Sequence, residues 1–469
     1  MAAAFFCIPS LIIQLGDARF GLLSLLWVLV SYFNMFDLGI GRSLTHAISV
    51  NLSKKNGKEL GNILKTGIVA ILVLGVVGSL TLAILVFFGV PLIKFVADPL
   101  EAKRASLLMA TAIPAIILTS GFRGILEAFH EFKIINLIRI PAGLWTFLSP
   151  LLAINYWKND LIIVSAVLVA GRYLVCFVHG YYVNRLVSKY KIEVETSSIS
   201  IKSAKILFKT GGWITISNLI AAFMGYVDRF MIGGILSASA VAYYVSPQEL
   251  VTKLWIIPGS ITMVLFPTLS AKIFTRSKKK EVEIFFDKSI NIIILSIFPI
   301  AFTIGIFSKE ILYFWINQNF AEQGALIMQI FVLGVVINSI AQVPFTLIQS
   351  AGHSKLITII YLIQFPFFII TLYTLTKLYG IEGASLAWLF RIIVDAIMMF
   401  YTIRFLPINF KKNKQFKMLI LKIALIILTF YSLCNASLIF KLLAVFVLAL
   451  TSIFLIFMIK AYKLPKIHS

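Results

Sequence analysis

The stretch LGDARFGLLSLLWVLVSYFNMFDLGIGRSLT, residues 15–45, places two charges directly after a long apolar run. Residues 20–35 contain no charged side chain, and Asp37 and Arg42 then follow with two glycines between them. A run of this length approaches the roughly 20 residues with which an apolar helix crosses a bilayer. The stretch therefore predicts a membrane-spanning helix with charges at its far end.

The composition shows that the whole chain is apolar, not only this stretch. Of 469 residues, 60% are hydrophobic and 13% are charged, with a mean hydropathy of +0.98. Soluble domains carry roughly 25% charged residues, so we predict an all-α polytopic membrane protein. The net charge of +23 does not indicate nucleic-acid binding, because the basic residues lie in short breaks between apolar runs and form no platform interleaved with aromatic residues.

Several chemistries are not expected. Cys7, Cys176 and Cys434 lie in apolar stretches and predict free thiols rather than disulfides. No Walker motif occurs, so ATP is not expected as the direct energy source. We expect no enzyme activity, no cofactor and no metal site, and the first apolar run lacks the basic segment of a cleavable signal peptide.

Apolar runs predict about fourteen spans, the first of them short. They are residues 2–15, 20–46, 65–92, 105–126, 134–155, 160–183, 205–233, 238–270, 289–307, 323–350, 356–376, 381–403, 418–434 and 437–459. If the N-terminus is cytoplasmic, the inner loops and tail hold 25 Lys and Arg residues and the outer loops hold 8. This bias predicts that both termini are cytoplasmic. The longest outer loops are expected near residues 93–104 and 308–322.

The two halves of the chain resemble each other at an offset of about 220 residues. The segment LEAFHEFKIINLIRIP from Leu126 aligns with IQSAGHSKLITIIYLI from Ile348, and two further segment pairs keep the same order, one of which aligns Arg172 with Arg391. Each repeat holds six spans, so the repeats are parallel. We predict an N-lobe at residues 1–186, a cytoplasmic linker at 187–204, a C-lobe at 205–405 and two appended helices with a basic tail at 406–469.

Two segments of the sequence resemble a known protein family. The opening stretch, with VDRFMIGGILSASAVAYYVSPQELVTKLWIIPGSITMVLFPTLSA from Val227, resembles the polysaccharide-exporting branch of the MOP superfamily. That branch contains Wzx-type O-antigen flippases and is related to MATE exporters and lipid II flippases. The resemblance covers about residues 10–405. It implies two six-helix lobes around a V-shaped cavity that opens to either side in turn, with helices 1, 2, 7 and 8 lining it.

Charges deep in the predicted spans are the candidate site residues, because a charge at the bilayer centre usually faces a cavity or a partner. Arg172 has no acid one turn away, so its partner must come from another helix or from a ligand. The anionic head-group binding candidates are Arg42, Arg172, Arg229, Lys253 and Arg391, and the candidates for ion coupling or charge pairing are Asp37, Asp228, Glu249 and Asp395. Glu249 and Asp395 each lie one turn from a base, Lys253 and Arg391.

Asp37 and Arg42 allow two interpretations. On a regular helix they lie about 140° apart, so they do not face each other. In one interpretation Arg42 ends the helix at the inner face while Asp37 forms a bond within the lobe. In the other, Asp37 points into the N-lobe, toward Arg172, and Arg42 lies at the inner mouth of the cavity. Trp145, Trp213 and Trp255 are candidates for stacking on sugars or for ordinary packing.

The resemblance implies a flippase for undecaprenyl-pyrophosphate-linked oligosaccharides in the bacterial cytoplasmic membrane, serving O-antigen or another surface polysaccharide. Arg side chains would replace the hydration of the pyrophosphate, and a proton or sodium ion and a polysaccharide polymerase are the further expected partners. A MATE-like ion-coupled exporter is the alternative function. A membrane-embedded glycan polymerase or glycosyltransferase ranks third, because the predicted outer loops are short and lack paired carboxylates.

Overall fold

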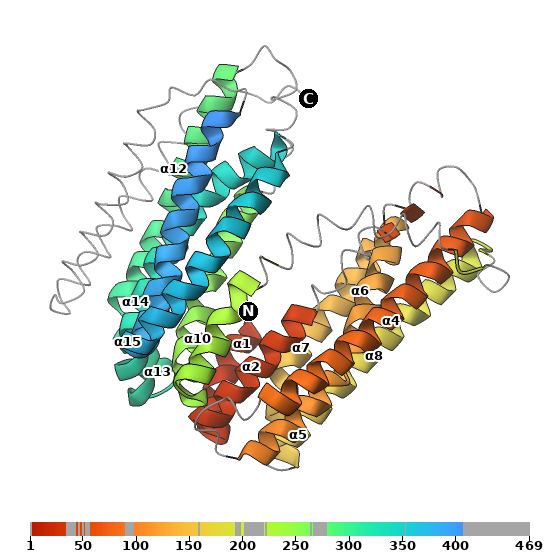
Figure 1. Cartoon of the computed structure of the whole chain (residues 1–469), viewed down its shortest axis with the longest axis horizontal. Helices are drawn as coiled ribbons and strands as arrows, with labels where there is room; N and C mark the ends of the chain where they lie inside the picture. Colours follow the sequence, from red (N-terminus) through yellow and green to blue (C-terminus); the bar gives the residue numbers. More distant parts are fainter. Residues whose placement is uncertain are drawn as a thin grey trace. The chain divides into compact units, whose positions relative to one another are not determined.

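The computed structural model describes residues 2–33, 44–45, 47–48, 51, 57–89, 98–157, 160–192, 198–200, 220, 223–262, 265, 279–351 and 353–406. Within this part of the chain the regular elements are helices, with no strand. The chain divides into two compact units, Met1–Ala242 and Tyr243–Ser469, and each is described by itself (Figure 1).

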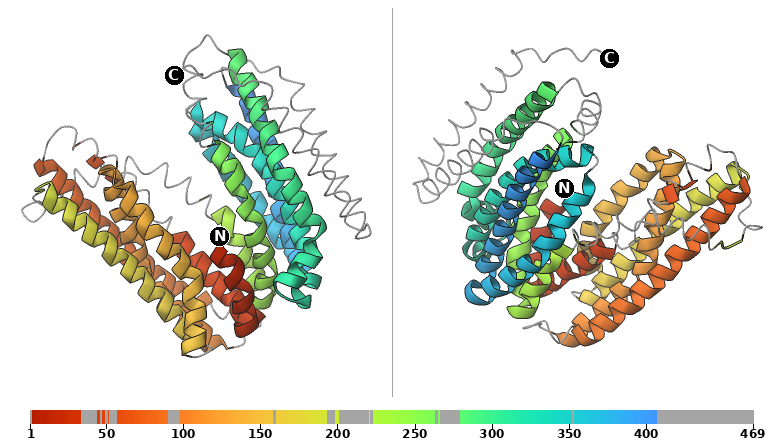
Figure 2. Two further views of the ribbon diagram at one scale, coloured as in Figure 1. Left: turned by 180° about the vertical axis from the view of Figure 1, so that it is seen from behind. Right: turned by 45° about the horizontal axis from the view of Figure 1, so that its top comes forward.

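The first unit is a bundle of long helices. In chain order it contains α1 (Ala2–Leu15), α2 (Asp17–Phe33), α4 (Gly57–Gly89), α5 (Pro99–Ala110), α6 (Ile113–Ala128), α7 (Phe132–Tyr156) and α8 (Leu161–Lys189). Helix α8 packs against α5, α6 and α7, and α4 packs against α6, as the views in Figure 2 show from two sides. The core of the unit is therefore built around α6 and α8.

The second unit has the same kind of construction. Helix α10 (Ala238–Thr252) enters it and continues as the 3₁₀ turn η2 (Lys253–Trp255); α12 (Lys279–Ile306), α13 (Ser308–Trp315), α14 (Gln318–Ser350), α15 (Ser354–Thr402) and the 3₁₀ turn η3 (Ile403–Phe405) follow. Helix α14 packs against α12, α13 and α15, and it is the most buried span of this unit. It forms the centre of the unit.

Side-chain caps explain where three of these helices begin. Asp98 Oδ1 accepts hydrogen bonds from the backbone N–H groups of Leu100 and Glu101, at 2.8 and 3.1 Å. Asp160 caps α8 through Ile162 N at 2.7 Å, and Asn317 caps α14 through Phe320 N at 3.0 Å. Asp and Asn are preferred at this position because they satisfy N–H groups that the first turn leaves without partners.

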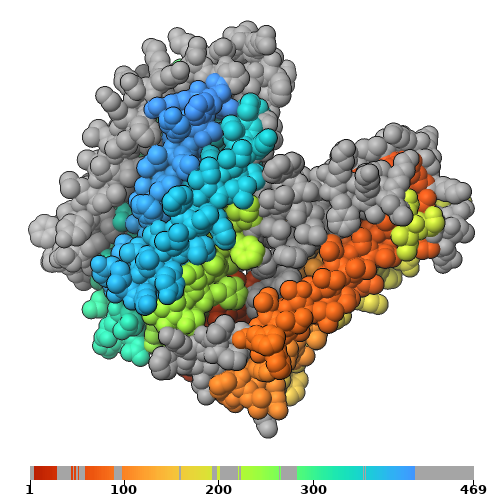
Figure 3. Space-filling view, in the orientation of Figure 1, coloured from red at the N-terminus to blue at the C-terminus, as the bar shows by residue number. Residues whose placement is uncertain are grey.

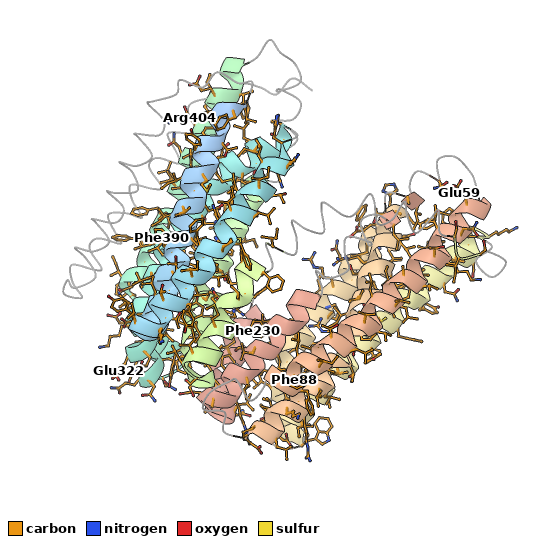
Figure 4. The ribbon with its side chains drawn as sticks, in the orientation of Figure 1. Glu59, Phe88, Phe230, Glu322, Phe390 and Arg404 are labelled. Carbon is orange, nitrogen blue, oxygen red and sulfur yellow. The ribbon has the colours of Figure 1, made fainter. Side chains whose placement is uncertain are left out.

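Seven segments of the described chain are long and apolar enough to cross a membrane, so the chain is a multi-pass membrane protein. Their outward faces are apolar: Leu362, Phe367 and Ile370 on α15 are about half exposed or more, and α15 and α4 lie at the visible surface of their units in Figure 3. Charged side chains occur near the helix ends, such as Glu59, Glu322 and Arg404 in Figure 4. The predicted count of fourteen spans includes segments outside the described residues and stays a prediction.

The structure differs from the sequence expectation at the two predicted outer loops. Part of residues 93–104 forms the start of α5, and residues 308–322 contain α13 and the start of α14. These helices are short or begin with charged residues, so they fall below the apolar threshold that identifies spans. The predicted spans at 356–376 and 381–403 are the two arms of α15, which bends at Gly380 with φ +61°. Glycine adopts this left-handed conformation without strain.

Candidate functional site

Arg172 on α8 is the deep base of the first unit. Its Nη2 donates a hydrogen bond to Thr146 Oγ1 on α7, at 3.3 Å. The partner thus comes from another helix, as expected, but it is a hydroxyl group rather than an acid. Within the described residues no carboxylate lies within 4.0 Å of Arg172. A guanidinium group has five N–H donors, and one neutral hydrogen bond leaves it able to bind an anion.

Trp145 lies next to this arginine and is held by packing. Its indole Nε1 donates to the carbonyl oxygen of Val167 at 3.2 Å. Its ring fills the space left by Gly171, where a Cβ atom would overlap the indole. These contacts favour the packing interpretation for Trp145, although 38% of its surface is exposed. Trp213 lies outside the described residues.

Asp228 and Arg229 are both buried, at 0% and 7% exposure. Asp228 Oδ1 accepts a hydrogen bond from the backbone N–H of Arg229 at 2.8 Å, and the Arg229 guanidinium lies over the ring of Tyr226, 5.4 Å from its centroid. The Asp228 carboxylate thus contacts the backbone of Arg229, while the Arg229 guanidinium group contacts Tyr226.

Glu249 and Lys253 form the expected ion pair, with Lys253 Nζ 2.7 Å from Glu249 Oε2. Both side chains remain partly exposed. Lys253 begins η2, where the α-helix tightens into a 3₁₀ turn. In the described part of the chain the indole Nε1 of Trp255, at the end of η2, is buried without a hydrogen-bond partner. A 3₁₀ turn within a helix often marks a hinge.

Arg391 and Asp395 lie on the second arm of α15 and face the first arm. Asp395 is 6% exposed and accepts a long hydrogen bond of 3.5 Å from Gln364 Nε2. The Arg391 guanidinium lies over the ring of Phe368, 5.2 Å from its centroid. The two charges interact electrostatically, but in the described chain they form no ion pair within 4.0 Å. The charge of Asp395 therefore acts on Arg391, one helical turn away, without a direct contact between the two side chains.

Asp37 and Arg42 lie outside the described residues, so neither interpretation of this pair is tested. The remaining candidates are divided between the two units. Arg172 and Arg229 belong to the first unit, while Lys253 and Arg391 belong to the second. In the described chain no group of three or more His, Cys, Asp or Glu side chains could hold a metal ion. Cys7 and Cys176 are free thiols, and Cys434 lies outside the described residues.

One buried ionic contact was missed by sequence reasoning. Arg19 Nε on α2 lies 2.9 Å from Glu101 Oε2 on α5, and Glu101 Oε1 accepts a hydrogen bond from Leu161 N at the start of α8 at 2.8 Å. Glu101 is 8% exposed. It thus joins three helices that are far apart in the sequence. In the sequence, Glu101 is an acid in the first turn of a helix capped by Asp98. This pattern does not indicate which residue the acid contacts.

Comparison with known proteins agrees with this fold. Residues 1–273 match the family described as polysaccharide biosynthesis protein. A protein of Shigella flexneri named "Putative O-antigen transporter" is 28% identical over 82% of this chain and 90% of its own length. Among solved structures, an inward-facing multidrug resistance MATE family transporter of the MOP superfamily has a TM-score of 0.72, with 14% identity over 86% of this chain and 94% of its own.

The lipid II flippase MurJ, in an inward closed conformation, has a TM-score of 0.69, with 17% identity over 98% of this chain and 97% of its own. The chain shares the fold of these two membrane transport proteins. The present chain belongs to the polysaccharide biosynthesis protein family. The resemblance drawn from the sequence is thereby confirmed.

Proposed function

We propose that this protein is a flippase that moves undecaprenyl-pyrophosphate-linked oligosaccharides across the bacterial cytoplasmic membrane by alternating access. The observation that carries the proposal is membership of the polysaccharide biosynthesis family together with the fold of a lipid flippase along nearly the whole chain. The Shigella flexneri relative points to O-antigen as the class of glycan. The relatives are described as transporters and flippases, so the proposal involves no catalytic step.

The chemistry of the deep bases supports this substrate. Moving a pyrophosphate through hydrocarbon without water costs a large free energy. Arg172 could replace part of that hydration, because its guanidinium forms one hydrogen bond within the described residues, to Thr146, and a guanidinium group can form paired hydrogen bonds to phosphate oxygens. Arg42, Arg229, Lys253 and Arg391 are the further candidates for the same role.

Energy would come from coupling to an ion, either a proton or sodium, from the membrane potential or from the product gradient. Asp37 and Asp228 are our candidates for ion coupling, and Glu249 and Asp395 for charge pairing. The two six-helix repeats, the appended helices at 406–469 and cytoplasmic termini belong to the same proposal. The span formed by α5 and α6, Pro99–Ala128, and the span Gln318–Ser350 of α14 are separated by the same offset of about 220 residues, which supports the repeats. A polysaccharide polymerase is the expected partner downstream.

Complementation tests the proposal. The chain is expressed in a Shigella flexneri strain that lacks its own O-antigen transporter, and surface O-antigen is measured. We expect the wild type to restore the polymer, Arg172→Ala to abolish it, and Arg172→Lys to retain part of the activity because it keeps the charge but not the paired hydrogen bonds. Full activity of Arg172→Ala at normal expression would make Arg172 a packing residue.

A multidrug exporter is the second candidate, favoured by the likeness to the MATE fold. If the inserted wild-type chain restores no polymer in strains that make several different glycans, a drug-efflux assay with the same strains decides. Efflux that depends on Glu249 or Asp228 would favour the exporter, since cation sites need carboxylates.

A further inference from the structure

The C-terminal half of α14 carries an unusual face for a membrane-spanning helix. Asn338, Gln342, Phe345 and Gln349 are separated by four, three and four residues, so they lie on one face of the helix. All four are partly exposed, while nearly every other residue between 334 and 350 is buried. We call these four residues the amide face.

The three amide side chains have no hydrogen-bond partner among the residues that the structure describes. In the described chain, no hydrogen bond reaches the side chain of Asn338, Gln342 or Gln349; Gln342 contributes only its backbone carbonyl, which accepts from Thr346 Oγ1 at 2.7 Å. By contrast, Gln329 nearer the start of the same helix bonds Ser308, and Gln364 on α15 bonds Asp395. Within α14, the amide face is thus the part whose amide side chains have no hydrogen-bond partner among the described residues.

Lipid cannot be that partner. Each amide has two donors and an acceptor, and an unsatisfied polar group in hydrocarbon costs several kcal/mol. The faces of this unit that suit lipid are apolar, with exposed residues such as Ile363 and Phe367 on α15 and Ile300 on α12. Asn338 and Gln342 lie well inside the span Gln318–Ser350 and have no hydrogen-bond partner among the described residues, so water or a polar ligand suits them better than lipid does.

We infer that the amide face binds the uncharged sugar rings of the carried glycan. This inference rests on the proposed function and names the part of the substrate that this face takes. Amide groups match sugar hydroxyls because each donates and accepts, and Phe345 in the same row offers an apolar ring against which the C–H face of a sugar can pack. The face carries no charge, so it suits the sugar part of the substrate and not its pyrophosphate.

The test uses the purified full chain in proteoliposomes with two probes. The first is undecaprenyl pyrophosphate bearing one N-acetylglucosamine, and the second is the same lipid bearing a neutral oligosaccharide. The variants are Asn338→Leu with Gln342→Met, singly and together. Both replacements keep the approximate shape and make the span more apolar, so insertion is favoured. Gln323→Met, an exposed amide elsewhere on α14, is the matched control.

We expect the double variant to slow transfer of the oligosaccharide probe about tenfold, as the loss of two ordinary hydrogen bonds implies. Transfer of the single-sugar probe should change less than about threefold on the same reasoning, and Gln323→Met should leave both rates unchanged. Asn338→Gln, which keeps an amide, should recover part of the oligosaccharide rate.

The outcomes separate the two proposals. A wild-type chain that moves both probes, with a double variant that leaves both rates unchanged or slows them equally, overturns the sugar-binding role but not the flippase. A wild-type chain that moves only the single-sugar probe likewise overturns the sugar-binding role but not the flippase. A wild-type chain that moves neither probe overturns the flippase and the sugar-binding role together.

Discussion

At the scale of single residues, two arginines of the first unit differ in the partners that their side chains contact. Arg19 lies against the buried carboxylate of Glu101, which also accepts from the backbone of Leu161. Among the described residues, the hydrogen-bond partner of Arg172 is the hydroxyl group of Thr146. Breaking a buried ion pair is destabilising because it leaves an uncompensated buried charge, whereas a charge deep in a membrane span usually faces a cavity, a ligand or a partner. We therefore propose different tasks for these two arginines: Arg19 contributes to stability and Arg172 to ligand binding.

Glu101→Gln should destabilise the first unit. A glutamine side chain has one oxygen acceptor, so either Arg19 or the Leu161 N–H would face an NH₂ group instead of an oxygen. Hydrogen bonds that involve a charged group contribute about 1.5–3 kcal/mol, and we expect a loss of unfolding free energy of that order, measured by thermal unfolding of the detergent-purified chain.

Glu127→Gln is the matched control for this change. Its carboxylate lies 3.7 Å from Arg123 in a pair whose side chains are 36% and 49% exposed, and exposed pairs contribute about 0–1 kcal/mol. If both variants shift the unfolding temperature equally, the three-helix contact of Glu101 is not a stabilising one.

At the scale of helices, both units use a glycine to seat a tryptophan from a neighbouring helix or arm. Gly171 on α8 receives Trp145 of α7, and Gly334 on α14 receives Trp388 of α15. In each case a Cβ atom would overlap the ring. Small residues let membrane helices approach closely, and packing of this kind replaces the hydrophobic driving force that is absent within lipid. These contacts hold α8 and α14 in place, and with them Arg172 and the amide face.

Gly334→Ala should therefore destabilise the second unit, even though alanine favours helix more than glycine does. Overpacking a close contact costs typically about 1–3 kcal/mol, which exceeds the gain of about 1 kcal/mol in helix propensity. We expect a lower unfolding temperature and quenched or shifted Trp388 fluorescence.

The same substitution at Gly143 on α7, where a Cβ atom would meet nothing within 4 Å, should be neutral or stabilising. A destabilised Gly143→Ala together with an unaffected Gly334→Ala would show that helix propensity and not the Trp388 contact governs these sites.

At the scale of the whole molecule, the sequence predicted the features that depend on apolar length. The run at 134–155 corresponds to α7, and the run at 160–183 corresponds to the N-cap and most of α8, because an uninterrupted apolar segment has few other ways to satisfy its backbone. The sequence did not predict α13, whose eight residues include two charges. It also did not predict the contact of Arg19 with Glu101, because that contact depends on packing between distant segments. Asn338 and Gln342 were also missed, because uncharged amides barely alter an apolar average.

Orientation is the property of the whole molecule that the charge bias predicts most directly. Ser188 at the end of α8 and Glu322 near the start of α14 are both exposed, and three predicted spans, 205–233, 238–270 and 289–307, separate them. An odd number of crossings places the two residues on opposite sides of the membrane. The positive-inside rule puts Ser188 in the cytoplasm, because Arg185, Lys189 and Lys191 surround it.

Single cysteines test this arrangement in a background where Cys7, Cys176 and Cys434 are replaced by serine. Glu322→Cys should react with a membrane-impermeant maleimide in intact spheroplasts, whereas Ser188→Cys should react only after permeabilisation. The reverse pattern would invert the predicted orientation and place the basic loops outside. Reaction of both in intact spheroplasts would require an even number of crossings between them, and since residues Val282–Ile306 already form one span, one of the two remaining runs, 205–233 or 238–270, would then not cross the membrane.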